Sequence, residues 1–274
     1  MAQNANRPHP AEEQDKQIEA ALQKIKNRIV VFSGKGGVGK TTVAVNLAYA
    51  LVKQNFEVGL LDADITGPNV PQMTGAESSP AVLGDTRQVV PQVKDGLRII
   101  SIAPMLPKDS PLIWRGPLRS NAIRQFLADV LWGELDYLLA DLPPGTGDEV
   151  LTAAQKMRPQ AAVVVTTPQE VSLLDCRRAV TMARKLDIPH IAVVENMSGL
   201  ICPYCGETID VFGTGGGEKM AEDMHVSFLG RIPMELKVRE GSDAGKPVVL
   251  EPSAGPTAEA FETITVRLQE TLIE

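Results

Sequence analysis

The chain has 274 residues, of which 43% are hydrophobic and 22% charged, and its formal net charge is −7. This composition can bury a sizeable core and excludes a disordered protein. The acidic balance and an aromatic content of 4% argue against a basic or stacking surface for nucleic acid and anionic lipid. No run approaches the roughly 18 apolar residues of a membrane span, and three cysteines are too few for a disulfide framework. We therefore expect a cytoplasmic protein with no nucleic-acid and no membrane partner.

The first 27 residues are more polar than the rest of the chain. Residues 1–15 contain Pro8 and Pro10 and no apolar run, which predicts a flexible leader. Ile18, Leu22 and Ile25 then recur at helical spacing, so a short amphipathic helix is expected before the main domain. The predicted organisation is a leader and helix over residues 1–27 and one folded domain over residues 28–274.

Short apolar runs alternate with amphipathic stretches from residue 28 onward. The runs predict strands at residues 29–32, 58–61, 97–102, 137–141, 161–166, 191–194 and 228–232. Amphipathic stretches predict helices such as those at residues 42–54, 118–131 and 172–186. Strands that are apolar throughout and alternate with helices predict an α/β fold whose mostly parallel sheet has helices on both faces. The Pro- and Gly-rich segments 67–91 and 103–117 are predicted to be loops within it.

A glycine-rich stretch follows the first of these strands. Its sequence is Gly34-Lys35-Gly36-Gly37-Val38-Gly39-Lys40-Thr41, which matches G-x-x-x-x-G-K-[ST], and a predicted helix begins at Thr42. In this motif backbone N–H groups surround a phosphate, and the helix N-terminus adds partial positive charge. Lys40 is expected to reach the β- and γ-phosphates of a nucleotide, and the Thr41 hydroxyl to ligate Mg²⁺.

Aspartates end two of the other strands. Asp62 and Asp64 follow a buried strand at the carboxyl edge of the sheet, where α/β folds place ligands. Two residues apart on an extended chain, they point the same way and are expected to share a water and Mg²⁺. Asp141 ends another strand and looks like a Walker B carboxylate, and the loop over residues 141–148 looks like switch II. In that loop, Gly145 is expected to bring a backbone N–H close to the γ-phosphate. Asp148 in that loop can equally cap the next helix.

Two of the three cysteines stand in one short turn, Cys202-Pro203-Tyr204-Cys205-Gly206. Such a turn places two sulfurs on one side and suits metal or cluster ligation. Cys176 lies in a helical run and is predicted to pack in the core. A four-sulfur site then needs two chains, each donating Cys202 and Cys205 at a twofold interface. The residues leave open a [4Fe–4S] cluster, a zinc-bridged dimer, a redox dithiol and unligated cysteines.

Several motifs together resemble a known family. The sequence K-G-G-x-G-K-T, beginning at Lys35, is similar to the deviant Walker A class of dimeric P-loop ATPases. With D-I-T-G-P-N-V-P from Asp64, E-N-M-S from Glu195, the C-P-Y-C-G turn and K-V-R-E-G from Lys237, residues 25–270 resemble the Mrp/ApbC iron–sulfur cluster carriers. The resemblance implies an ATP-hydrolysing homodimer that holds a [4Fe–4S] cluster between its subunits and transfers it to apo iron–sulfur proteins. Residues 28–274 would form the P-loop ATPase domain that carries the C-x-x-C loop.

The resemblance also implies roles for individual residues. Lys35 would contact the nucleotide of the partner protomer, much as an arginine finger does, and Asp64 would orient or activate the attacking water. Lys35, Lys40 and Asp64 are therefore the predicted catalytic set. Asn196 would contact the adenine edge, and Pro233 lies in the segment that closes over the base. The chain lacks the N/T-K-x-D sequence of guanine-binding proteins, so ATP is favoured over GTP.

Two functions on the same fold remain as alternatives. A positioning ATPase of the MinD or ParA kind would need a basic amphipathic C-terminal helix or a basic patch, but residues 257–274 contain Arg267 against four glutamates. A reductase similar to the nitrogenase iron protein takes its cluster cysteines from two separated loops of each chain, whereas this chain has one C-x-x-C.

Overall fold

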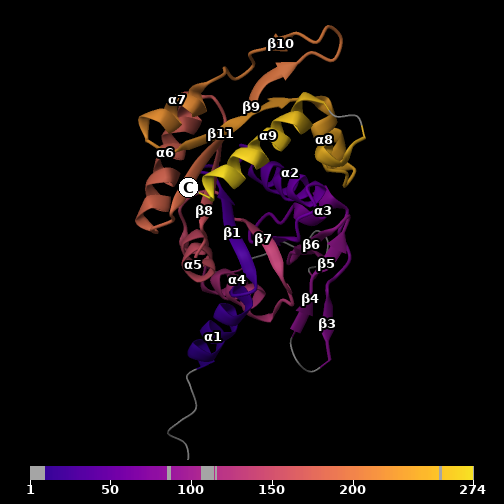
Figure 1. Ribbon diagram of the computed structural model, residues 1–274, viewed down its shortest axis with the longest axis vertical. Coiled ribbons are helices and arrows are strands. Elements are labelled where there is room, and N and C mark those ends of the chain that lie inside the picture. Colours follow the sequence, from indigo (N-terminus) through magenta and orange to yellow (C-terminus); the bar gives the residue numbers. More distant parts are fainter. Residues whose placement is uncertain (1–9, 85–87, 106–113, 115, 253–254, 274) are drawn as a thin grey trace, which may run out of the picture.

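The computed structural model describes residues 10–84, 88–105, 114, 116–252 and 255–273. Within these residues nine strands form the main sheet, in the order β10-β9-β8-β1-β7-β2-β6-β5, with β11 also paired to β9 (Figure 1). The strands are β1 (Ile25–Phe32), β2 (Val58–Asp62), β5 (Gln92–Lys94), β6 (Leu97–Ile100), β7 (Leu135–Asp141), β8 (Ala161–Thr166), β9 (His190–Ile201), β10 (Thr208–Ile209) and β11 (Ser227–Met234). All pairs in this sheet are parallel except β5 with β6 and β10 with β9.

Helices cover both faces of the sheet. One face carries α1 (Pro10–Leu22), α4 (Gly116–Asp129), α5 (Asp148–Met157), α6 (Glu170–Lys185) and α7 (Gly216–Asp223). The other carries α2 (Lys40–Lys53), α3 (Val70–Thr74), α8 (Leu236–Asp243), η2 (Val248–Leu250) and α9 (Pro256–Thr271). Along β1, Val30 and Phe32 pack in the first core while Ile29 and Val31 pack in the second, because successive strand residues point to opposite faces. The predicted α/β fold is confirmed.

The predicted strands and helices are present, with shifted ends. The helices predicted at 42–54, 118–131 and 172–186 each begin two residues earlier, as α2, α4 and α6. Strand β9 continues to Ile201, well past the predicted end at residue 194, because the polar side chains of Glu195 and Asn196 are buried with hydrogen-bond partners rather than exposed in a loop. The segment predicted as a loop at 67–91 contains α3 and the hairpin β3 (Ala81–Leu83) to β4 (Gln88–Val90). The short helix η1 (Ala103–Met105) lies in the second predicted loop, of which residues 106–113 and 115 lie outside the described residues.

The N-terminal segment is more ordered than its sequence suggests. Residues 10–15 belong to α1 rather than to a flexible leader, and residues 1–9 lie outside the described residues. Ile25, expected on the helix, begins β1 instead. The Asp15 carboxylate accepts hydrogen bonds from Lys156 of α5, at 2.8 and 2.9 Å, and from Arg124 of α4, at 2.9 Å. These hydrogen bonds attach α1 to α4 and α5, and the local sequence pattern of the polar N-terminal residues does not predict them.

The described helices include none with the length and apolar character needed to cross a membrane.

Candidate functional site

The glycine-rich loop connects β1 to α2, and its last glycine lies against a side chain of β9. Gly39 caps α2 in the left-handed region, with φ of 80°. A Cβ atom at this position would lie 2.1 Å from the side-chain amide nitrogen of Asn196, so only glycine fits. Val38 is buried, and its carbonyl accepts a hydrogen bond from that same amide at 2.9 Å. At the start of the loop, Gly34 lies against the backbone carbonyl of Asp175 in α6.

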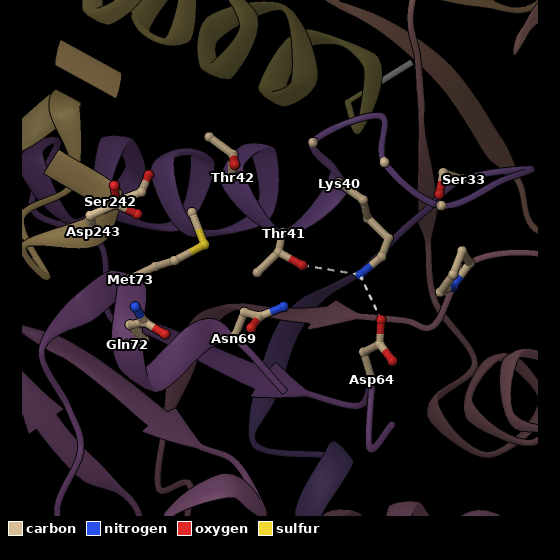
Figure 2. Close-up of a pocket in the computed structure, with 14 residues that line it drawn as sticks. Ser33, Lys40, Thr41, Thr42, Asp64, Asn69, Gln72, Met73, Ser242 and Asp243 are labelled. Atoms are coloured by element: carbon tan, nitrogen blue, oxygen red, sulfur yellow. Dashed lines mark hydrogen bonds and ion pairs between the residues drawn. The ribbon is translucent and has the colours of Figure 1, made fainter. Parts of the chain in front are cut away.

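Lys40 extends from the first turn of α2 into a group of acidic and hydroxyl side chains (Figure 2). Its ammonium donates to Asp141 Oδ1 at 2.6 Å and to Thr41 Oγ1 at 3.3 Å, and it lies 3.7 Å from Asp64 Oδ2. The Thr41 hydroxyl donates to the other oxygen of Asp141 at 2.7 Å. The predicted phosphate lysine and the predicted magnesium threonine are therefore both held by the carboxylate that ends β7.

Asp62 lies beside this group and is completely buried. Its register partner across β2 and β7 is Asp141, so two carboxylates end neighbouring strands at the same edge. Asp62 Oδ2 accepts from Ser101 Oγ at 2.9 Å and from the Val70 backbone N–H at 3.3 Å, whereas Oδ1 has no hydrogen-bond partner among the described residues. Burial raises the pKa of Asp62 well above its ordinary value, and the neighbouring charge of Asp141 adds to this shift.

Burial also raises the pKa of Asp141, while Lys40 and Thr41 act in the opposite direction. At this edge of the sheet the Lys40 ammonium therefore faces the carboxylates of Asp62, Asp64 and Asp141. A buried carboxylate oxygen without a partner is costly, and carboxylate and hydroxyl oxygens are the ligands that Mg²⁺ prefers. The donor set of Thr41, Asp62 and Asp141 therefore fits a magnesium ion beside a bound phosphate.

A cavity of about 370 Å³ opens over the loop. The loop contributes Gly36, Gly37, Gly39, Lys40, Thr41 and Thr42 to its wall, as predicted for a phosphate cradle. Further wall residues are Asn69, Gln72 and Met73 at α3, and Ser242 and Asp243 at the end of α8 (Figure 2). Pro144, which lies near Gly36, also lines the cavity. Asn69 and Pro144 stand in sequence motifs described above, whereas Gln72, Met73, Ser242 and Asp243 lie outside every such motif and were not predicted.

Other predicted residues contact protein groups. Asn196 is buried under the loop, as described above, and Pro233 lies in β11, where its carbonyl accepts from Thr257 Oγ1 at 3.3 Å. The Gly145 N–H in the switch II-like loop donates to the Ser33 carbonyl at 2.8 Å, so it would have to leave Ser33 to reach a phosphate. The Lys35 side chain is half-buried and has no hydrogen bond or ion pair to the described residues.

The cysteine turn follows β9 and is open to solvent. The Cys202 N–H donates to the Glu207 carbonyl and the Gly206 N–H donates to the Cys202 carbonyl, both at 2.9 Å, which closes the turn. Cys205 is exposed, and Tyr204 beside it is 97% exposed. Backbone N–H groups of Cys205 and Tyr204 lower the pKa of Cys202.

The third cysteine cannot join this pair. Cys176 is buried in α6, where burial raises its pKa to about 12, which confirms that it packs in the core. Among the described residues no three His, Cys, Asp or Glu side chains gather as a metal site. One chain therefore presents a single pair of sulfurs at the turn.

Comparison with known proteins places this arrangement in a family. Residues 24–269 match the family model described as NUBPL iron-transfer P-loop NTPase. The chain is 52% identical over 260 residues to the iron–sulfur cluster carrier protein of Methanocaldococcus jannaschii, covering 94% of this chain and 89% of that protein. A solved nucleotide-binding protein from Archaeoglobus fulgidus, in complex with ADP, is 40% identical, with a TM-score of 0.78 over 90% of this chain and 96% of that one.

The cell-division ATPase MinD of Pyrococcus furiosus shares the fold at 23% identity, with a TM-score of 0.66 over 89% of this chain and 99% of that one. The match to the family model covers most of the chain and includes both the P-loop and the C-x-x-C turn. This chain belongs to the NUBPL iron-transfer family of P-loop NTPases.

Proposed function

We propose that this chain forms an ATP-hydrolysing homodimer that carries a [4Fe–4S] cluster between its subunits and transfers it to apo iron–sulfur proteins. The observation that carries the proposal is that one chain contains the residues of a nucleotide site but only half of a four-sulfur site. One chain supplies the loop lysine, the hydroxyl and the carboxylates of a nucleotide site, but only two sulfurs at the exposed turn. A second copy related by a twofold axis would supply the other two.

The nucleotide half of the proposal assigns a task to each residue at the sheet edge. The Lys40 ammonium leaves Asp141 to bind the β- and γ-phosphates, and Thr41, Asp141 and Asp62 would hold Mg²⁺. The bound Mg²⁺ would supply charge neutralisation on the phosphate oxygens. Asp64, which accepts a hydrogen bond from Thr66 at 3.0 Å, orients the attacking water. Lys35 reaches the nucleotide of the other subunit, which makes hydrolysis depend on the dimer.

The cluster is the cargo of this protein rather than a resident group. The four sulfur ligands of Cys202 and Cys205 in two chains lie at an exposed interface, where thiolates of an acceptor protein can approach. Such a ligand set should release its cluster more readily than a four-cysteine pocket buried in one chain. The free thiols suit a reducing compartment, and we assign the protein to the cytoplasm. The M. jannaschii relative, named a cluster carrier, supports the same function.

The decisive test is metal analysis of anaerobically purified protein. We expect four irons and four acid-labile sulfides per dimer, with the dimer mass established by light scattering, and transfer of the cluster to an apo-ferredoxin. The variant Cys205→Ser should contain no iron. About one zinc per dimer with no uptake of iron on reconstitution would refute the carrier and leave a zinc-bridged ATPase.

A further inference from the structure

The segment that carries the cysteines begins and ends on one buried carboxylate. Glu195 in β9 is fully buried, and its Oε1 accepts a hydrogen bond from Ser198 Oγ at 2.5 Å and from the Gly215 N–H at 2.9 Å. Its Oε2 accepts from the Gly217 N–H at 2.5 Å, in the first turn of α7, and the Arg231 guanidinium lies 3.7 Å from its Oε1. Because Ser198 precedes the cysteine turn and Gly215 follows it, the same side chain fixes both ends of the excursion over residues 198–215. We call Glu195, Ser198, Gly215 and Gly217 the Glu195 clamp.

The residues next to Glu195 contact the phosphate loop. Asn196 donates to the Val38 carbonyl, as described above. Met197 has a left-handed backbone, with φ of 58°, and its terminal methyl lies 3.7 Å from the place that a Cβ on Gly39 would occupy. Non-glycine residues adopt this conformation only where their surroundings hold them in it. Strand β9 is therefore tied to the loop at its bend.

The strand then leads directly to the cysteines. Gly199 has φ of 79°, and a Cβ on it would lie 2.6 Å from the Thr208 methyl, so β10 packs closely across the bend. Leu200 and Ile201 pair with β10 in antiparallel register, and the Cys202 N–H continues the ladder to Glu207. Contacts thus run without a break from Val38, through β9, to the cysteine turn.

We propose that Glu195 is a positioning residue which makes the cysteine turn respond to the nucleotide at the phosphate loop. The proposal rests on the proposed function in so far as Cys202 and Cys205 are the cluster ligands. Binding a phosphate turns loop N–H groups toward the anion, which moves the Val38 carbonyl and, with it, Asn196. The Glu195 clamp joins both ends of residues 198–215 to β9. A displacement of β9 at Asn196 therefore also moves Cys202. Strand β9 would then have two positions, one with and one without a bound phosphate. Each position would favour a different arrangement of the phosphate loop and of the cysteine turn, as coupling between two sites requires.

The reactivity of the two thiols in the cluster-free dimer gives a direct readout. We would measure the alkylation rate of Cys202 and Cys205 by iodoacetamide, with and without Mg²⁺ and a non-hydrolysable ATP analogue. In the natural protein we expect the analogue to change the rate at least about fivefold, the lower end of ordinary coupling. Glu195→Gln should reduce this ratio to below about twofold, because an amide keeps only one acceptor oxygen, turns an NH2 group toward a backbone N–H, and removes the negative charge that faces Arg231. The affinity for the analogue should stay unchanged.

Two further variants separate this role from simple structural support. Ser198→Ala removes only the hydroxyl at one end of the excursion and should lower the ratio in the same direction by less, which keeps the test valid if Glu195→Gln does not fold. Asp223→Asn is the matched control, because Asp223 also lies in α7 and pairs at the surface with Arg177 of α6 rather than with Glu195 or Ser198. It should leave the ratio unchanged.

The outcomes distinguish this inference from the proposed function. If the analogue leaves thiol reactivity unchanged in the natural protein, or if a folded Glu195→Gln keeps the full ratio, the inference is wrong while the iron and sulfide content still decides the carrier. A ratio that falls only in step with nucleotide affinity also overturns it. If the ratio depends on Glu195 in a protein that takes up no cluster, the inference stands and the carrier fails.

Discussion

The phosphate loop and the cysteine turn lie on the same polypeptide but are built in opposite ways. At the loop, Lys40 is 6% exposed and Asp141 is fully buried, and these two charged groups are already paired with each other. At the turn, Cys205 is exposed and Tyr204 is 97% exposed. The turn is held by backbone hydrogen bonds at its base, so its shape is fixed while its sulfurs remain accessible.

This difference indicates what each region needs from outside. A buried ion pair keeps its geometry without help, and a nucleotide has only to displace one partner of Lys40. Two sulfurs in an open turn cannot enclose a cluster or a tetrahedral metal ion, so under the proposed function that region depends on a second molecule. The comparison therefore predicts that changes at the turn abolish cargo without harming the fold, whereas changes at the loop affect the nucleotide.

The largest effect is expected from Cys205→Ser. The variant should lose all bound iron, because the site keeps at most one sulfur per chain, while its melting temperature stays unchanged because the side chain is exposed. Iron analysis and a thermal melt of the cluster-free protein check both statements. Gross unfolding of the cluster-free variant would contradict the comparison and point to a structural role.

Cys176→Ser is the matched control for that experiment. The same atom is replaced, but Cys176 is buried in α6, so the fold should lose about 1–3 kcal/mol through a poorly satisfied hydroxyl. Iron binding should persist in the folded fraction. Loss of iron from this variant at full stability would mean that the two regions are not separate.

A second large effect is expected at the loop. Lys40→Ala should weaken binding of ATP by at least about 100-fold, because a buried charge-assisted contact to phosphate is lost. Lys35→Ala should bind ATP normally and lower kcat by about 1000-fold, in the range of a cation supplied in trans. Equilibrium binding and single-turnover hydrolysis distinguish the two. A Lys35→Ala variant with full kcat would remove the role of the second subunit in hydrolysis.

These sites differ in how far the sequence predicts them. The loop motif, the strand-ending aspartates and the C-x-x-C turn are local patterns, and a strand before a helix is enough to place them. Contacts between segments far apart in the sequence have no such signature: Ser101, just after β6, binds Asp62, and Gly215 and Gly217 bind Glu195. Polar residues at 195–198 therefore look like a loop in sequence although they lie in the middle of β9.

A smaller effect is expected from Asp64→Asn. The substitution keeps the size of the side chain and the contact with Thr66, but it removes the charge that orients water, so kcat should fall by about 100-fold with nucleotide affinity unchanged. Asp148→Asn is the control, since Asp148 begins α5 in the same region; its kcat should change little. Equal losses in both variants would show that the charge of the whole edge matters, rather than the position of Asp64.

The smallest effect is expected at α1, which Figure 1 places at the opposite end of the molecule from β10. The hydrogen bond from Lys156, followed by the charges of Arg124 and Lys156, lowers the pKa of Asp15 below 3.8. A carboxylate with a lowered pKa in the folded state stabilises the fold above pH 3.8, and this contribution is lost as the pH falls.

Asp15→Asn should therefore lower the melting temperature by about 1–3 °C at pH 7, as expected for a partly exposed ion pair worth at most about 1 kcal/mol. The difference from the natural protein should shrink as the pH falls below 3.8 and the carboxylate becomes protonated. Iron content and hydrolysis should not change, because Asp15 touches neither site. However, Lys156 belongs to α5, which begins where the switch II-like loop ends. A fall in kcat in Asp15→Asn at unchanged stability would mean that α1 acts on the nucleotide site through α5. Residues outside the buried ion pairs of the phosphate loop would then also control hydrolysis.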